Sequence, residues 1–134
     1  MPTLPDVFVT TPIAHRGLHS PGKPENSLAA ATAAIEAGYG IELDIQPASD
    51  GTPMVFHDYR LNRLLGQDGV IGQRDVAALA AMRILGSDQG VPTLAQFLEL
   101  VAGKVPLLIE IKDQDGRLGP DIGDLHARVV EALA

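Results

Sequence analysis

The chain has 134 residues, of which 46% are hydrophobic and only 4% aromatic, so it suits one domain with a core of Leu, Ile, Val and Ala. It contains no cysteine, which excludes disulfides and thiolate metal sites and leaves oxygen and imidazole as metal ligands. Its net charge is −7 and its Lys and Arg residues are scattered, so we expect no nucleic-acid partner.

The hydropathy of the chain bears on where the protein works. The N-terminal segment MPTLPDVFVT has neither the basic start nor the long apolar run of a signal peptide. No stretch reaches the roughly 18 apolar residues that a membrane-spanning helix requires. These features predict a cytoplasmic protein without an integral membrane segment.

The predicted elements begin with a short strand. Residues 7–14 (VFVTTPIA) indicate a first strand or the approach to one. Pro12 has no N–H group to donate within a sheet, so we place the core of this strand at residues 13–16. A loop rich in Gly, Pro and Ser follows it.

A helix and a second strand come next. Asn26 or Ser27 is suited to the N-cap of the helix, and Gly38 is suited to its C-terminal cap. Residues 40–46 (GIELDIQ) then alternate apolar and polar side chains, which is typical of a strand with two different faces.

A turn and a third strand follow the second strand. Asp50 and Gly51 predict the turn, and residues 53–57 (PMVFH) predict the strand. Residues 60–90 give weaker signals, and we expect only one short helix there, near residues 75–82.

The last third of the chain gives clearer signals. Thr93 and Gln96 match a capping box at the start of a helix that Gly103 ends. Residues 105–112 (VPLLIEIK) predict a fourth strand, and residues 125–133 predict a final helix.

The resulting order is β-α-β-β-α-β-α, with a small additional helix before the third main one. Strands that alternate with helices at this spacing imply parallel βαβ units. We therefore predict an α/β fold in which four parallel strands are covered by helices.

Polar residues fall where the four predicted strands end. AHRG (14–17) closes the first strand, IELDI (41–45) forms the second, FHD (56–58) closes the third, and IEIK (109–112) closes the fourth. The carboxyl ends of parallel strands are the edge at which α/β barrels and open sheets place their active sites. The sequence therefore indicates a site at this edge.

Strand alternation assigns the charged residues to one face. Glu42 and Asp44 share a face of the second strand, and Glu110 and Lys112 share a face of the fourth. In a barrel this face points into the lumen, so three carboxylates converge there and repel one another. A divalent cation removes that repulsion. Oxygen ligands suit Mg²⁺ or Ca²⁺, and Mn²⁺ less often.

Each of these residues also has an ordinary interpretation when it is taken alone. A strand acid is usually a surface charge, a lone histidine such as His15 is usually packed or solvated, and a residue such as Lys112 usually snorkels at the surface. We assign His19 and His126 to this ordinary class. The coincidence of charged groups at the strand ends favours a functional site for the others.

The motifs AHRG, PENS, IELDI, DGTPMVFHD, VPTLAQFL and IEIK occur in this order over residues 12–112. Together they resemble the glycerophosphodiester phosphodiesterase family. Members of that family usually have PENT, so Ser27 is a small departure without an evident chemical consequence.

The resemblance implies a TIM-type barrel that hydrolyses a small-molecule glycerophosphodiester to an alcohol and glycerol 3-phosphate. The residues to which it assigns roles are the metal ligands Glu42, Asp44 and Glu110, the general acid and base His15 and His57, and the phosphate ligands Arg16 and Lys112. Which histidine is the acid stays open, as does attack by water or by a substrate hydroxyl. Asp58 either orients His57 or caps the strand, and Glu25 is a candidate supporting group.

The length of the chain conflicts with a complete barrel, which typically needs about 250 residues. We interpret residues 1–134 as a partial catalytic domain, the first four β/α units of a TIM-barrel type fold. A fragment of a longer enzyme is our first explanation, and self-association or pairing with a second half-barrel is the next. The alternatives for function are a lysophospholipase D or sphingomyelinase D-like phosphodiesterase, and a non-catalytic remnant that binds metal or phosphate.

Overall fold

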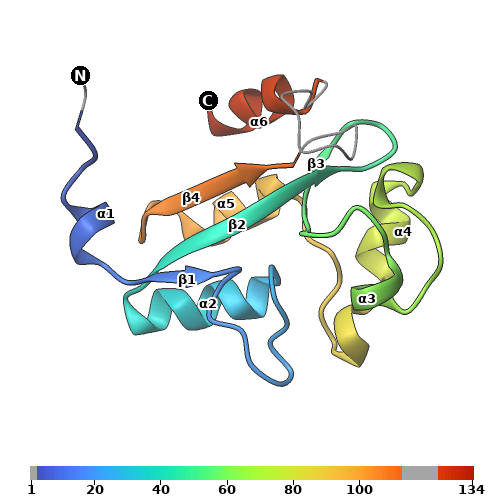
Figure 1. Cartoon of the computed structure of the whole chain (residues 1–134), viewed down its shortest axis with the longest axis horizontal. Helices are drawn as coiled ribbons and strands as arrows, with labels where there is room; N and C mark the ends of the chain where they lie inside the picture. Colours follow the sequence, from blue (N-terminus) through green and yellow to red (C-terminus); the bar gives the residue numbers. More distant parts are fainter. Residues whose placement is uncertain (1–2, 113–123) are drawn as a thin grey trace.

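The computed structural model describes residues 3–112 and 124–134. Within these ranges the chain forms one sheet with helices packed against it (Figure 1). The elements in chain order are α1 (Val7–Thr10), β1 (Ile13–His15), α2 (Leu28–Ala37), β2 (Gly40–Pro47), β3 (Pro53–Val55), α3 (Asn62–Leu65), η1 (Ile71–Gln73), α4 (Val76–Ala81), η2 (Ile84–Gly86), α5 (Leu94–Val101), β4 (Leu107–Ile111) and α6 (Leu125–Leu133).

The long strand β2 is the centre of the sheet. It pairs in parallel with β1, with Ile13 opposite Gly40, and in parallel with β4, with Asp44 opposite Glu110. The segments β2 and β4 are far apart in the sequence, so the strand register alone brings Asp44 and Glu110 together. The α/β class with helices outside a parallel sheet is confirmed.

The prediction of four parallel strands is wrong, because β3 runs antiparallel to β2 with Val55 opposite Ile45. Residues 48–52 alone connect the two strands, and such a short connection allows a hairpin, whereas a parallel crossover needs a dozen or more residues. The described residues therefore contain three parallel strands and one short antiparallel strand.

The apolar face of β2 forms the centre of the main core. Ile41, Leu43 and Ile45 are fully buried there. Helices α2, α5 and α6 cover this same face, and they contribute the buried residues Ala31, Ala34, Leu94, Phe97, Val101, Leu125 and Val129. Because strand side chains alternate, the polar residues of β2 are left on the opposite face.

The predicted N-caps of α2 and α5 and the C-cap of α2 are confirmed, whereas α5 ends at Val101 and is capped by left-handed Ala102, one residue before the predicted Gly103. The Ser27 hydroxyl accepts a hydrogen bond from the N–H of Ala30 at 3.0 Å, and Gly38 ends α2 in the left-handed conformation. Thr93 and Gln96 form the reciprocal capping box of α5. These capping residues fix where α2 and α5 begin. The start of α2 in turn sets the length of the loop that follows β1.

Two segments differ from the prediction. Val7–Thr10, which the sequence indicated as a first strand or its approach, forms one helical turn, α1. The strand itself, β1 at Ile13–His15, agrees with the core predicted at residues 13–16. Residues 60–90 contain four short helices instead of one, and they enclose a second core. The buried members of that core are Ala48, Met54, Phe56, Leu61, Leu64, Leu65, Ile71, Leu79, Ile84 and Val91.

The second core forms a small subdomain that lies beyond the end of β2, where α3 and α4 sit together (Figure 1). Its elements are three to six residues long, which is too short to show a helical period in the sequence. In the described ranges of the chain, no helix is long and apolar enough to cross a membrane.

Candidate metal centre

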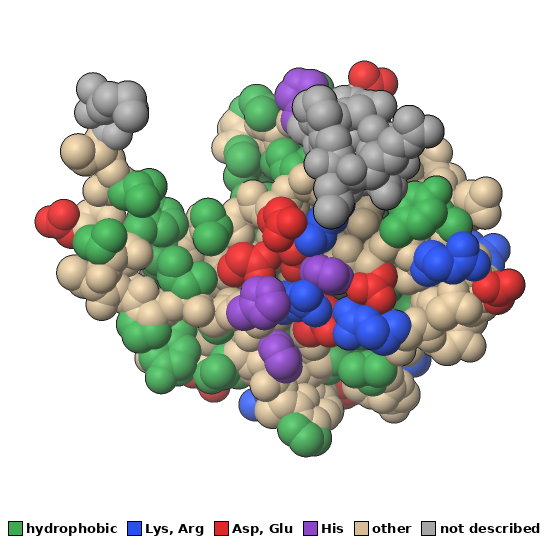
Figure 2. Space-filling view, viewed as in Figure 1, with side chains coloured by type: hydrophobic (Ala, Val, Ile, Leu, Met, Phe, Trp, Pro, Cys, Tyr) green, Lys and Arg blue, Asp and Glu red, His purple; other side chains and the backbone are tan. Residues whose placement is uncertain are grey.

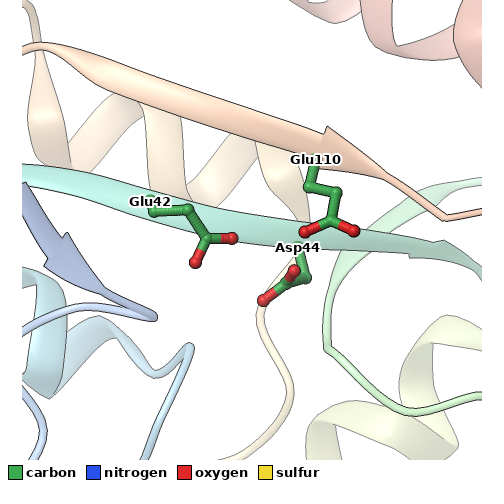
Figure 3. Close-up of side chains that lie close together, drawn as sticks. All are labelled: Glu42, Asp44 and Glu110. Carbon is green, nitrogen blue, oxygen red and sulfur yellow. The ribbon is translucent and has the colours of Figure 1, made fainter.

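Strands β2 and β4 bring three carboxylates together on the face opposite the helices. One carboxylate oxygen from each of Glu42, Asp44 and Glu110 lies within 4.8 Å of the other two. Their side chains point toward one another from the two neighbouring strands (Figure 3). The structure thus places these three residues as strand alternation predicts, and their role as metal ligands stays a prediction.

The three carboxylates differ in burial and in electrostatics. Asp44 is only 1% exposed, whereas the Glu110 side chain is 58% exposed. Burial and the neighbouring charge of Asp44 raise the pKa of Glu42 to about 7. Burial also acts to raise the pKa of Asp44, but the hydrogen bond from Asn26 and the charge of Lys112 outweigh it, so this pKa is lowered.

The oxygen atoms at this centre fit a bound divalent cation. Within the described residues, both carboxylate oxygens of Glu42 and Oδ1 of Asp44 are buried and form no hydrogen bond, although Lys112 Nζ lies 3.3 Å from Asp44 Oδ1 as an ion pair. Buried polar atoms in proteins almost always have a partner, and an ion that ligates these oxygens would supply it. An all-oxygen set of this kind suits Mg²⁺ or Ca²⁺.

Asn26 fixes the orientation of Asp44, and the sequence did not indicate this role. Its Nδ2 donates to Asp44 Oδ2 at 3.1 Å, and its Oδ1 accepts from the backbone N–H of Asp44 at 3.4 Å. Asn26 adopts a left-handed backbone with φ of 56°, a conformation that Asn tolerates better than most residues. The PEN motif is therefore more than the start of a helix.

The two predicted catalytic histidines come from two different parts of the sheet. His15 ends β1, and its Nε2 is 3.5 Å from Glu42 Oε2. His57 follows β3, and its Nδ1 is 2.7 Å from Asp58 Oδ1. Asp58 thus contacts His57 directly, which favours its interpretation as an orienting group over that of a strand cap.

The two predicted phosphate ligands also reach the centre. Arg16 Nε is 3.7 Å from Asp44 Oδ2, and Lys112 Nζ is 3.3 Å from Asp44 Oδ1. Lys112 also donates to Glu110 at 2.9 Å. Arg16 and Lys112 therefore lie next to the carboxylates. An anion that bound beside a metal ion at this centre would lie close to their positive charges.

The backbone after β1 is shaped to present Arg16. Arg16 itself has φ of 61°, and Gly17 has φ of 82°. A Cβ atom at position 17 would lie 2.9 Å from the Ala30 Cβ, so only glycine allows this loop to pack on α2. The close approach explains why the HRG motif ends in glycine.

Arg63 is a site residue that sequence reasoning missed. It lies on α3 of the small subdomain and donates to both oxygens of Glu25, at 2.7 and 3.1 Å. It also donates to both oxygens of Asp58, at 2.9 Å each. Glu25 accepts from Arg16 as well, at 3.0 Å. No pattern in residues 60–90 indicates this pairing, because it depends on tertiary structure.

The charged side chains of the site gather on one face of the molecule. Acidic, basic and histidine side chains lie side by side in the middle of this face, which is the side opposite the covering helices (Figure 2). All seven residues singled out by the sequence occur among the described residues. Glu25, Asn26, Asp58 and Arg63 add a hydrogen-bonded frame around them.

We expect the Arg63 pairs to stabilise the protein less as the pH falls. Burial acts to raise the pKa of Glu25, but hydrogen bonds and charge from Arg63 and Arg16 lower it below the ordinary 4.5. Hydrogen bonds from Arg63 lower the pKa of Asp58 below 3.8. The unfolded state then binds more protons than the folded state in this range, so the stabilisation is present above these ordinary values and is lost below them.

The variant Arg63→Met tests this pH dependence. At neutral pH we expect its free energy of unfolding to be lower than that of the wild type by about 1–3 kcal/mol, toward the low end because the guanidinium is half exposed. The difference should shrink as the pH falls from about 7 to about 3, which urea denaturation measures. Arg60→Met is the control, because the ion pair that Arg60 forms among the described residues is with the exposed Asp68. A constant difference for Arg63→Met would contradict the prediction.

The fold and the site together define a class of protein. The chain is an α/β protein with an acidic centre on the polar face of the parallel strands β2 and β4. The profile of the Glycerophosphoryl diester phosphodiesterase family matches residues 15–131. The chain therefore belongs to this family.

Individual relatives agree with the family assignment. The chain is 38% identical over 111 residues to a glycerophosphodiester phosphodiesterase of Caldanaerobacter subterraneus subsp. tengcongensis, covering 77% of this chain and 45% of that protein. A crystal structure of a Thermotoga maritima glycerophosphodiester phosphodiesterase is 35% identical, with a TM-score of 0.72 and coverage of 89% of this chain and 47% of that one.

A third relative is similar over almost all of this chain. It is a phosphodiesterase of Oleispira antarctica, solved in complex with the product sn-glycerol-3-phosphate. It is 29% identical, with a TM-score of 0.78 and coverage of 95% of this chain and 53% of that one. The chain thus spans about half the length of the relatives that it matches.

Proposed function

We propose that this chain supplies the metal centre and the acid–base residues of a phosphoric diester hydrolase. The enzyme acts on glycerophosphodiesters such as glycerophosphocholine and releases an alcohol and glycerol 3-phosphate. The observation on which the proposal depends is the cluster of Glu42, Asp44 and Glu110, whose oxygens lie within 4.8 Å of one another and include buried atoms without a hydrogen-bond partner.

The proposed ligands of the cation are Glu42, Asp44 and Glu110. These residues would hold Mg²⁺ or Ca²⁺, and the ion would supply Lewis-acid stabilisation of negative charge on the phosphoryl group. Asn26 holds Asp44 through both its side chain and its backbone, so the most buried of the three carboxylates is already oriented before an ion binds.

Arg16 and Lys112 are proposed to bind the phosphate group. Both cations lie within 4 Å of Asp44, which places them next to the cluster of carboxylates. A phosphodiester that approaches the centre would meet two donors that stabilise negative charge on its oxygens. Arginine and lysine are both common phosphate ligands, and the planar guanidinium also fixes orientation.

His15 and His57 are proposed to move the protons. Hydrolysis requires one group that accepts a proton from the nucleophile and another that gives one to the leaving alcohol. Imidazole is suited to both roles near neutral pH. The Asp58 carboxylate accepts from Nδ1 of His57, which leaves Nε2 of that ring for the reacting group.

The relatives support the substrate class and a larger active form. The Oleispira antarctica phosphodiesterase was solved with sn-glycerol-3-phosphate, and its chain is about twice as long as the part matched here. The remaining wall of the barrel would come from additional sequence, from a second half-barrel or from a second copy of this chain. We rank the first of these highest because the match covers only about half of each relative's single chain.

Calorimetric titration with MgCl₂, CaCl₂ and MnCl₂, beside a mass measurement in solution, tests the proposal. We expect one divalent cation to bind per chain, with micromolar to millimolar affinity on the order of that of ordinary carboxylate sites. Release of glycerol 3-phosphate from glycerophosphocholine is then assayed on the same sample. Failure of all three cations to bind would contradict the proposed centre. Binding without turnover by a monomer is the result expected of a catalytic domain that lacks part of its barrel, and a non-catalytic remnant would give the same result.

A further inference from the structure

Arg63 makes more contacts than a surface residue usually does. Its side chain is 48% exposed, yet its guanidinium forms a pair of hydrogen bonds with each of two carboxylates that are largely buried. Glu25 takes one pair, at 2.7 and 3.1 Å, and Asp58 takes the other, at 2.9 Å each. Only the planar, five-donor guanidinium can serve two carboxylates in this way.

The pair with Asp58 orients the carboxylate that contacts His57. Asp58 Oδ1 lies 2.7 Å from His57 Nδ1, and Arg63 donates to both oxygens of the same carboxylate at 2.9 Å each. An aspartate is ionised at neutral pH with or without a neighbouring cation, and an ionised carboxylate only accepts hydrogen bonds. While Arg63 holds Asp58 in this orientation, the neutral His57 ring must have its proton on Nδ1. In this tautomer the lone pair is on Nε2.

The pair with Glu25 determines the position of Arg16. Glu25 is 10% exposed in its side chain and accepts from Arg16 Nη1 at 3.0 Å through Oε2, the oxygen that also accepts from Arg63. Arg16 Nε in turn lies 3.7 Å from Asp44. If Arg63 were removed, the Glu25 carboxylate would be free to rotate, and the guanidinium of Arg16 would move with it.

We propose that Arg63 is a positioning residue that sets His57 and Arg16 at the same time. It selects the Nδ1–H tautomer of His57 through Asp58 and fixes the guanidinium of Arg16 through Glu25. Because Arg63 belongs to α3, the small subdomain of residues 60–90 is thereby coupled to the chemistry at the strand ends. The kinetic consequence rests on the proposed function, whereas the tautomer follows from the contacts alone.

Nitrogen-15 NMR of labelled histidine tests the inference on this 134-residue chain, without metal or substrate. Protonated and unprotonated ring nitrogens have well-separated shifts, and spectra are recorded at about pH 8, where imidazoles are largely neutral. We expect the wild type and Arg60→Met to show His57 with a protonated Nδ1. Arg60 is a matched control because it pairs with the exposed Asp68.

Arg63→Met is expected to give His57 a mixture of the two tautomers, and Arg63→Lys a partial mixture, because an ammonium group cannot form two bidentate pairs. If Arg63→Met does not fold, Arg63→Lys decides, since it keeps the charge. A His57 signal that stays in the Nδ1–H form in the folded variant would overturn the inference. So would a wild-type ring that is protonated on Nε2.

The kinetic test separates this inference from the proposed function. In a form of the protein that releases glycerol 3-phosphate, we expect Arg63→Met to lower kcat about 10- to 100-fold, with Arg60→Met unchanged, as for other groups that orient a reacting residue. If no form is active, the proposed function fails while the tautomer result still stands. If Arg63→Met turns over at the wild-type rate, only the positioning role is overturned.

Discussion

Replacing Glu110 by Gln is expected to weaken binding of a divalent cation by at least about 100-fold. Substitutions of groups that merely support a metal ligand cost about 10- to 100-fold in affinity, and Glu110 is proposed to contact the ion directly. An amide oxygen keeps the shape of the ligand but loses its negative charge, which hard cations require. Calorimetric titration with Mg²⁺ and Ca²⁺ measures the loss.

The same variant should remain folded, because Glu110 is 58% exposed and its side chain does not contribute to the core. We expect its free energy of unfolding to change by no more than about 0.5 kcal/mol, which removes unfolding as an explanation for lost binding. Glu99→Gln is the matched control, since Glu99 is an exposed acid on α5. Undiminished binding by Glu110→Gln, or equal loss in Glu99→Gln, would contradict the assignment.

Asp44→Asn should weaken binding at least as much, and its effect on stability should differ. Asp44 is 1% exposed and interacts with Asn26, Arg16 and Lys112. Loss of its charge leaves these donors with a weaker acceptor, so we expect a lower free energy of unfolding as well as lost binding. Glu110→Gln is expected to lose cation affinity alone, whereas Asp44→Asn is expected to lose both cation affinity and stability.

Strand alternation was enough to predict which face bears the charged residues. Ile41, Leu43 and Ile45 fill the core, and the residues between them necessarily face the other way. Alternation gives the face but not the register. That Asp44 lies opposite Glu110 follows from the tertiary structure, which sets β4 beside β2 after a long intervening segment.

The direction of β3 follows from the length of the connection before it. The sequence predicts a turn at Asp50 and Gly51, and a turn of that length requires an antiparallel hairpin. The parallel βαβ rule needs a helix between the strands and so does not apply to this strand. The consequence for the site is small, because His57 lies beyond the end of β3 and is positioned by Asp58.

The frame around Arg63 could not be predicted from sequence patterns. Its partners Glu25 and Asp58 come from two separate loops, and α3 is a single helical turn. Such contacts leave no periodic signal, since each involves one side chain that is placed by tertiary packing. The parts of a site that lie on long strands are therefore predictable, and the parts supported by short irregular elements are not.

Replacing either of the proposed acid–base residues, His15 or His57, by alanine is expected to lower kcat by about 100- to 10,000-fold, the range typical of general acid–base catalysis. The assay is release of glycerol 3-phosphate from glycerophosphocholine at saturating metal, in whichever form of the protein is active. His15 and His57 lie outside the carboxylate cluster, so cation binding should be retained in both variants. Loss of turnover with intact binding identifies proton transfer as the missing step.

The control for the histidine variants is His126→Ala. His126 lies on α6, a helix that packs on the opposite, apolar face of the sheet, so its removal should leave kcat unchanged. His15→Ala and His57→Ala also need not be equal. A ring that Asp58 and Arg63 hold in one tautomer is prepared for its role, whereas the His15 side chain is 69% exposed and lies 3.5 Å from Glu42. Wild-type turnover by both variants would show that the acid–base assignment is wrong, while a larger loss for His57→Ala would link the rate to the Arg63 frame.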